Sequence, residues 1–255
     1  MNYSKYKQFK FDQSGSVLTV SFNRPDSLNA VNADLHTELS TLFADIATDH
    51  SVNAVVLTGA GRAFSAGGDL EWFRNITPQR LDVLFVEARK IIIDLLEMPQ
   101  PIIAAVNGAA AGLAATLALF CDVIYASETA RILDPHVRIG VTAGDGGAII
   151  WPLLVGPARA KQYLMTGDVV SAEEAERIGL INYVVSHEEL LPAATAMAQR
   201  LANGPQKAIR STKASVNKIL RDTANLVLDT SLALEKECFH TKDHKDAIAA
   251  FNTKR

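Results

Sequence analysis

The sequence has little of several features that mark particular classes of protein. Its 25 lysines and arginines do not outnumber its 28 aspartates and glutamates, so it lacks the basic surplus of a nucleic-acid-binding protein. It has only two cysteines, without paired spacing, which fits a reducing compartment better than a disulfide framework. Residues 1–5 contain no apolar core of a signal peptide. We therefore expect a cytoplasmic protein with no nucleic-acid partner.

Long uninterrupted apolar runs are missing as well. The best candidate, 102–121, is broken by Asn107 and Gly108 and has no basic flank, so we expect no membrane partner. Familiar phosphate-binding motifs are also absent. The loop 59–70 has Phe64 where a dinucleotide fingerprint needs its third glycine, and it has no Gly-Lys-Ser or Gly-Lys-Thr ending. We therefore expect an enzyme in which any anionic ligand is bound by a few local groups and not by an overall positive charge.

A pattern of strand, glycine-containing turn and helix recurs along the chain. Apolar or alternating runs that begin at Val17, Ala54 and Ile102 predict strands, and apolar residues at helical spacing follow each of them. The pattern predicts an α/β fold built as a spiral of β–α units. We expect residues 1–203 to form the core with the active site. Residues 204–255 are expected to form a helical region that packs on a neighbouring subunit as well as on the spiral.

The stretch from Gly59 to Leu70 follows the second predicted strand and consists largely of glycine and alanine. Small residues let a ligand approach backbone N–H groups closely, and Asp69 is placed to open a helix. A second turn leads from Val106 into a helix that is apolar on every side. If the two turns lie side by side, the N–H groups near Ala66 and Leu113 converge on one oxygen. Such an oxyanion hole contributes a few kcal/mol per donor in the transition state.

The sequence also contains partial matches to two other kinds of site. Ser65 lies in a near match to the G-x-S-x-G elbow of serine hydrolases, but it comes several residues after the strand that ends at Leu57. His240 and His244 have the spacing of a zinc pair, but no third ligand is evident, so we expect no metal. Trp72, Phe73 and Trp151 could line an apolar substrate pocket, although aromatic residues are more common in the core.

Six short motifs spread along the chain form a specific combination. They are Asn23-Arg24-Pro25 with Asn29-Ala30, the run from Gly61 to Leu70, Ala105-Val106-Asn107-Gly108, Cys121-Asp122, Leu164-Met165-Thr166-Gly167, and Ala250 to Arg255. With them the chain resembles the crotonase (enoyl-CoA hydratase/isomerase) superfamily over roughly residues 16–255. The resemblance implies a crotonase-like spiral of ββα units and a C-terminal helical trimerisation region. It also implies a homotrimer or a hexamer and an acyl-CoA substrate, with CoA as part of the substrate and no separate cofactor.

The resemblance also assigns roles to individual residues. It implies that the N–H groups of Ala66 and Leu113 form the oxyanion hole. It further implies that residues of two loops help to hold the CoA: Arg24, Gly67, Gly68, Asp69 and Leu70.

Two positions depart from the hydratases of this family. Those enzymes use two glutamates to handle the water, and the matching positions here are Thr116 and His136. Asp145 supplies a carboxylate nearby. The pair His136 and Asp145 resembles the arrangement in oxocamphor hydrolase and β-diketone hydrolase, although the second histidine of the camphor enzyme falls at Leu113. A histidine held by a carboxylate near neutral pH is a suitable general base.

The predicted enzyme binds the thioester carbonyl between two N–H groups and adds water to an enoyl-CoA, with His136 as general base and Asp145 orienting it or relaying a proton. Retro-Claisen hydrolysis of a β-diketone is one alternative, and a non-catalytic acyl-CoA binder is another. Each residue also has a structural alternative. Asp145 could cap a helix that begins near Gly146, His136 could be bonded to backbone, and Thr116 could bond back within its own helix.

Overall fold

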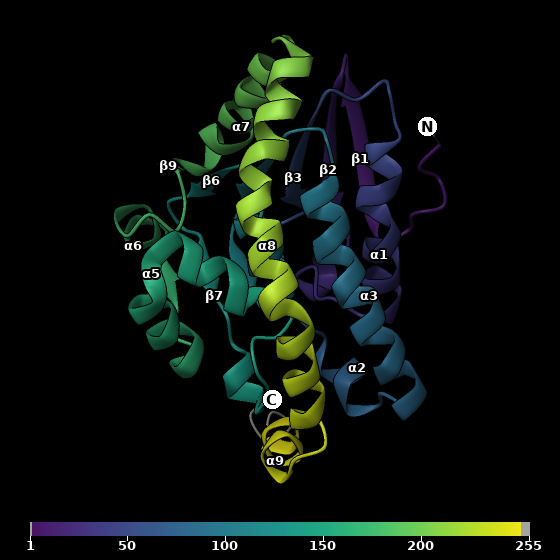
Figure 1. Cartoon of the computed structure of the whole chain (residues 1–255), viewed down its shortest axis with the longest axis vertical. Coiled ribbons are helices and arrows are strands. Elements are labelled where there is room, and N and C mark those ends of the chain that lie inside the picture. Colours follow the sequence, from purple (N-terminus) through teal and green to yellow (C-terminus); the bar gives the residue numbers. More distant parts are fainter. Residues whose placement is uncertain (1, 251–255) are drawn as a thin grey trace.

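A computed structural model describes residues 2–250, which form helices around a six-stranded and a three-stranded sheet (Figure 1). The strands are β1 (Phe9–Ser14), β2 (Val17–Phe22), β3 (Ala54–Gly59), β4 (Ile102–Val106), β5 (Ala109–Ala111), β6 (Val123–Ser127), β7 (Arg131–Leu133), β8 (Val170–Ser171) and β9 (Tyr183–Val185). The helices are α1 (Ala33–Ala47), α2 (Leu70–Arg74), α3 (Pro78–Glu97), α4 (Leu113–Leu119), α5 (Gly147–Thr166), α6 (Ala172–Arg177), α7 (His187–Ala202), α8 (Gln206–Cys238) and α9 (Lys242–Ala250), with short 3-10 turns η1 (Pro25–Ser27) and η2 (His136–Ile139). Most of the C-terminal motif, from Phe251 to Arg255, lies outside the described residues.

The larger sheet carries the predicted spiral. Its strand order is β1-β2-β3-β4-β6-β9, and every neighbouring pair is parallel except β1 with β2. The strands predicted from Val17, Ala54 and Ile102 are therefore adjacent in the sheet and follow one another in chain order. Parallel neighbours need crossover connections, which the intervening helices supply. The mixed α/β architecture predicted from the sequence is confirmed.

Helices cover both faces of this sheet, and β3 shows how. Val55 and Leu57 belong to the large core cluster that also contains residues of α1, α3 and α4. Ala54 and Val56 point to the other face, where they join a smaller cluster with α7. Because successive side chains of a strand point to opposite faces, a strand covered on both faces is a continuous apolar run. This explains why the run from Ala54 has no polar alternation.

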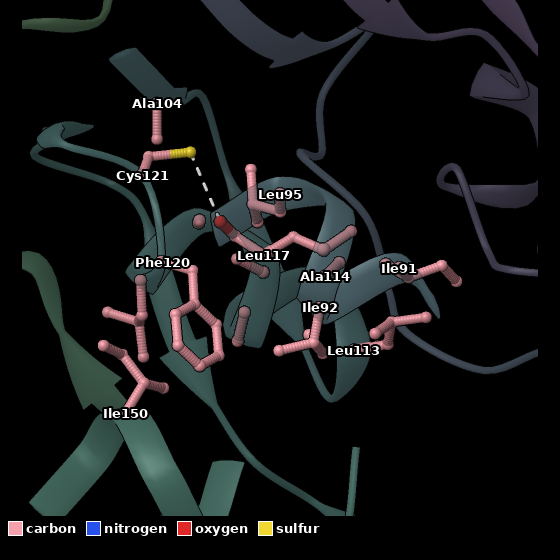
Figure 2. Close-up of a cluster of buried hydrophobic side chains, with 14 of the residues drawn as sticks. Ile91, Ile92, Leu95, Ala104, Leu113, Ala114, Leu117, Phe120, Cys121 and Ile150 are labelled. Carbon is pink, nitrogen blue, oxygen red and sulfur yellow. Dashed lines mark hydrogen bonds between the residues drawn. The ribbon is translucent and has the colours of Figure 1, made fainter. Parts of the chain in front are cut away.

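Helix α4 lies in the middle of the core. All of its residues from Leu113 to Leu119 are buried. Figure 2 shows Leu113 and Ala114 next to Ile92 of α3, and Phe120, which directly follows α4, next to Ile150 of α5. The Cys121 thiol donates to the Leu117 carbonyl at 3.3 Å. A helix that is apolar on every side is expected to be buried. Close packing on all sides fixes the position of its N-terminus, which matters for the site below.

Side-chain caps define the starts of five helices. The side chains of Asn32, Asp69, Thr77, Ser171 and Ser186 each accept a hydrogen bond from a backbone N–H group in the first turn of the helix that follows. These bonds satisfy donors that have no partner within a helix. The local sequence is therefore sufficient to set these boundaries.

The long helix α8 crosses the front of the molecule in Figure 1 and connects the C-terminal region to the core. Leu228 and Leu232 belong to the large core cluster. Lys213 donates to Asp122 at 2.8 Å, and the Ser231 hydroxyl donates to the Gly144 carbonyl at 2.8 Å. The division into 1–203 and 204–255 stays a prediction. Within residues 2–250, no helix is long and apolar enough to cross a membrane.

Candidate active site

The two glycine-rich turns lie side by side. The Ser65 N–H group donates to the Ala109 carbonyl at 2.9 Å, and the Ala111 N–H group donates to the Ser65 carbonyl at 3.0 Å. The loop after β3 is thereby paired with β5, the strand that leads to α4. The two turns are therefore adjacent, as an oxyanion hole formed by both of them requires.

The N–H group of Ala66 is not free, which corrects its predicted role. It donates to the Leu28 carbonyl at 2.9 Å. An N–H group that already serves a backbone carbonyl cannot bind a substrate oxygen without weakening that bond. Ala66 is thus part of the framework of the loop.

Gly68 offers a free N–H group next to Ala66 in this loop. A parallel bridge joins Gly68 to Val31, in which Val31 donates to the Gly67 carbonyl at 2.8 Å and Asp69 donates to the Val31 carbonyl at 3.0 Å. Because the N–H groups of an extended chain alternate in direction, the N–H group of Gly68 points away from Val31. Among residues 2–250 it has no hydrogen-bond partner.

The second donor is Leu113, at the start of α4. N–H groups in the first turn of a helix have no carbonyl partner within it, and the capping residue Gly112 provides no side chain. Gly112 has φ +54°, and a Cβ atom built there would lie 3.4 Å from Cε1 of His136. The start of α4 therefore lies directly beside the histidine. The structure is therefore compatible with the predicted role of the Leu113 N–H group as a donor in the oxyanion hole.

Phe73 closes the space above Gly68. A Cβ atom at residue 68 would lie 2.3 Å from the Phe73 ring, so any larger residue there requires the ring or the loop to shift. Phe73 also lines a cavity of about 400 Å³ together with Leu81 and Phe239. Trp72 stacks on Phe73, whereas Trp151 is fully buried in the core. Of the three aromatic residues considered for an acyl pocket, Phe73 is therefore the one placed at both the loop and the cavity.

His136 lies at the centre of three carboxylates from separate segments. Its Nδ1 atom is 2.5 Å from Oδ1 of Asp134, which follows β7. Its Nε2 atom is 3.4 Å from Oδ2 of Asp145, in the loop before α5, and 3.9 Å from Oε1 of Glu235 on α8. The side chain of His136 is only 12% exposed. The predicted pair is thus brought together and gains two further members.

The structural alternatives for these residues are not observed. Helix α5 is capped by Gly146 without any side-chain bond, so Asp145 is not its cap. The Thr116 hydroxyl donates to Asp145 at 3.4 Å instead of bonding within its own helix. The ring of His136 bonds to carboxylates and not to backbone. All three side chains therefore belong to one polar cluster at the N-terminus of α4.

Asp134 and Glu235 were missed in the sequence. Asp134 had a usable signal, because a carboxylate two residues before a histidine can reach its ring when the chain turns at Pro135. Glu235 had none. It is one of several charged residues on a long helix, and only the packing of α8 against the loop at Gly144 selects it.

The electrostatics of the cluster favour a positive histidine and an uncharged glutamate. Burial alone would lower the pKa of His136, but the charges of Asp134 and Asp145 outweigh it, and the pKa is raised well above its ordinary value. Burial also raises the pKa of Glu235 well above its ordinary value. The charge of His136 opposes that rise, and the two aspartates add to it. The cluster therefore holds an imidazolium with a proton to donate.

Neither of the other two kinds of site considered from the sequence is assembled by the described residues. Asp134, His136 and Asp145 offer ligand atoms within 4.8 Å of one another, but both nitrogens of the His136 ring already face carboxylates. His240 and His244 belong to no group of three or more metal-binding side chains among the described residues. The Ser65 hydroxyl is buried and donates to the Asn29 carbonyl at 2.7 Å. Ser65 therefore supports the loop and has no base beside it.

The loops predicted to hold CoA face one another. A guanidinium nitrogen of Arg24 lies 3.8 Å from Oδ2 of Asp69, and Arg24 also donates to the Ala30 carbonyl. Both side chains are partly exposed at the end of the sheet. Gly67 and Gly68 precede Asp69, and Leu70 begins α2. Arg24 is the one permanent positive charge among the predicted CoA-binding residues.

The parallel spiral, the paired turns and the buried N-terminus of α4 define an enzyme of the crotonase type. The family model described as enoyl-CoA hydratase/isomerase matches residues 12–255. The chain belongs to this family of enzymes, which confirms the resemblance seen in the sequence.

Curated and solved relatives agree with this assignment. A crotonyl-CoA hydratase of Syntrophomonas wolfei is 35% identical, with 98% of this chain and 96% of that protein aligned. An enoyl-CoA hydratase/isomerase from Mycobacterium paratuberculosis superposes with a TM-score of 0.92 at 36% identity, covering 95% and 98% of the two chains. A β-diketone hydrolase from the cyanobacterium Anabaena sp. PCC 7120, bound to (S)-3-oxocyclohexyl acetic acid, superposes with a TM-score of 0.86 at 31% identity, covering 93% and 96%.

Proposed function

We propose that the protein adds water to an enoyl-CoA and holds the thioester carbonyl between the N–H groups of Gly68 and Leu113. The observation that carries this proposal is the position of His136. Its Nε2 atom is 3.4 Å from Asp145 and lies beside the N-terminus of α4, where negative charge is stabilised. The curated hydratases at about the same length support the substrate class.

In this proposal the proton donor and the proton acceptor are different residues. The water oxygen attacks the β-carbon and gives a proton to the carboxylate of Asp145. The resulting enolate is stabilised by the two N–H groups, and the imidazolium of His136 gives its proton to the α-carbon. Asp145 then returns a proton to His136 across the 3.4 Å that separates them, so the cycle closes. The sequence suggested His136 as the base, but its raised pKa favours the donor role.

The same groups suit a second reaction, hydrolysis of a β-diketone by retro-Claisen cleavage. Here water attacks a carbonyl held by the two N–H groups and gives its proton to Asp145. The bond between the carbonyl carbon and the α-carbon then breaks, and His136 protonates the enolate that leaves. The histidine–carboxylate cluster in place of two glutamates favours this alternative, and the likeness to the Anabaena β-diketone hydrolase supports it.

The proposal includes how the substrate and the subunits are held. Arg24 would bind a phosphate of CoA, with the backbone from Gly67 to Leu70 beside it, and the chemistry would need no separate cofactor or metal. A homotrimer or a hexamer would cover the exposed apolar side chains on the neighbouring helices α3 and α8, among them Val86 and Leu226. The two free cysteines suit the reducing environment of the cytoplasm.

A substrate panel tests the proposed function. The purified protein is assayed with crotonyl-CoA, longer enoyl-CoA esters and cyclic β-diketones, with and without added CoA. Hydration of any enoyl-CoA supports the leading reaction, and cleavage of a diketone with no hydration replaces it by the second. An acyl-CoA binder without catalysis would bind the esters and turn over none of them. The variants His136→Ala and Asp145→Asn serve as controls, because an enzyme loses turnover in both while its affinity for CoA esters persists.

A further inference from the structure

The carboxylate of Asp134 differs from the other two carboxylates around His136 in how it is held. Its Oδ1 atom bonds to Nδ1 of the ring and also accepts the backbone N–H group of His136 at 3.3 Å. Its side chain is fully buried. Asp145 and Glu235 face the opposite nitrogen at longer distances, 3.4 and 3.9 Å. The ring is therefore tightly bonded on one side only.

The position of Asp134 is fixed by the elements around it. It directly follows Leu133, whose carbonyl accepts the Gly112 N–H group at 3.1 Å, so it is tied to the turn that opens α4. Its second oxygen, Oδ2, has no hydrogen-bond partner among the described residues. That oxygen lies against the start of α5, because a Cβ atom built on Gly147 would be 2.4 Å from it. The N-terminus of a helix stabilises a carboxylate in its charged form.

We infer that Asp134 is a positioning residue, whose carboxylate holds the proton of His136 on Nδ1 and directs Nε2 toward the substrate. The ring has two edges, and only one can face the turn at Gly112. Turning the ring over would break the bond to Asp134 and leave two buried partners unsatisfied. The nitrogen that bonds a carboxylate keeps its proton, and this determines the tautomer of the neutral ring. The inference rests on the catalytic role proposed for His136.

Nuclear magnetic resonance of the whole protein, labelled with ¹⁵N in its six histidines, tests the inference without any substrate. The signals of His136 are assigned by their loss in His136→Gln. In the wild-type protein we expect Nδ1 to stay protonated at every pH, with Nε2 as the nitrogen that titrates. A neutral ring protonated on Nε2 would overturn the inference. This outcome would not change the result of the substrate panel. The positioning role of Asp134 and the proposed function can therefore be disproved independently.

The variant Asp134→Asn extends the test to function. We expect kcat to fall roughly 10²- to 10⁴-fold, since the amide carries no charge and can turn its NH₂ group toward Nδ1, which selects the wrong tautomer. The pH profile of kcat should shift to lower pH, and the titration of His136 should shift with it. Asp145→Asn should lower kcat but leave Nδ1 protonated.

A matched control separates positioning from stability. Asp122 is also a bonded aspartate, although its side chain is 23% exposed, and it accepts from the Ile102 N–H group and from Lys213, both at 2.8 Å, at the far end of α4. Asp122→Asn should lower the stability of the protein without moving the His136 signals. If Asp134→Asn behaves in the same way as Asp122→Asn, Asp134 has only a structural role. If Asp134→Asn does not fold, the tautomer measured in the wild-type protein still decides.

Discussion

The two halves of the candidate site are built in different ways. The backbone half, the N–H groups of Gly68 and Leu113, comes from two neighbouring turns and uses no functional side chain. The side-chain half, His136 with Asp134, Asp145 and Glu235, is collected from three segments and carries the charge. The backbone half stabilises any enolate next to a carbonyl, whereas the side-chain half decides which proton moves. Substitutions in the side-chain half are therefore expected to change which reaction occurs. Substitutions in the backbone half are expected to abolish every reaction.

Removing the histidine gives the largest expected effect on the side-chain half. His136→Ala takes away the proton donor and leaves the buried carboxylates of Asp134 and Asp145 without their positive partner. We expect kcat to fall by about 10³- to 10⁴-fold, within the range for general acid–base catalysis together with loss of charge stabilisation. Steady-state kinetics and direct measurement of CoA-ester affinity are the checks. Turnover within tenfold of wild type would mean that the side-chain half is not the catalyst.

A substitution at Gly68 tests the backbone half. In Gly68→Ala the new methyl group would overlap the Phe73 ring, at 2.3 Å, so either the ring or the N–H group must move. We expect a loss of roughly 10²- to 10³-fold in kcat, the range seen when one oxyanion donor is displaced. The double variant Gly68→Ala with Phe73→Ala restores the space and should recover part of the loss. If the double variant is as inactive as Gly68→Ala, the position of the N–H group is not what the methyl group disturbs.

The same contrast explains what the sequence could predict. The strands, the caps and the buried α4 follow from local patterns, and so does the closeness of His136 to Asp145 once the family is identified. The donor in the loop was assigned to Ala66 instead of Gly68, since the direction of an N–H group depends on the pairing of residue 68 with Val31, which is not local. Glu235 could not be predicted, because the face of α8 that meets the core is chosen by packing.

The charge of Glu235 gives a smaller effect that depends on pH. The pKa of Glu235 is raised in the folded state above its ordinary 4.5, so folding binds a proton, and the folded state loses stability as pH rises from about 4.5 toward the raised pKa. Glu235→Gln cannot titrate and should lose less stability on the same rise, with a difference of up to about 1.4 kcal/mol per pH unit. Urea unfolding of both proteins at a series of pH values measures it. If the free energies of unfolding of the two proteins change with pH in parallel, the pKa of Glu235 is not raised.

The smallest effects are expected from two matched serines, one in each half. Ser65 donates to the Asn29 carbonyl at 2.7 Å beside the oxyanion loop, and Ser231 donates to the Gly144 carbonyl at 2.8 Å beside Asp145. Each hydroxyl has a second partner, since Ser65 also accepts the Gly67 N–H group at 3.3 Å and Ser231 also lies 3.0 Å from the Leu228 carbonyl. Each Ser→Ala change removes these buried bonds and should cost about 1–3 kcal/mol of stability.

Activity should nevertheless differ between the two serine variants. Ser65→Ala should retain kcat within about threefold, because the N–H group of Gly68 is still held by the bridge to Val31. Ser231→Ala should lower kcat by roughly three- to tenfold, because Asp145 follows directly on the released carbonyl and small displacements of a catalytic group are costly. Abolished activity in Ser65→Ala would revive the serine nucleophile. Equal losses of kcat in both variants would mean that the two halves depend equally on the hydrogen bonds that support them. The two halves would then differ in their chemistry and not in how rigidly they are held.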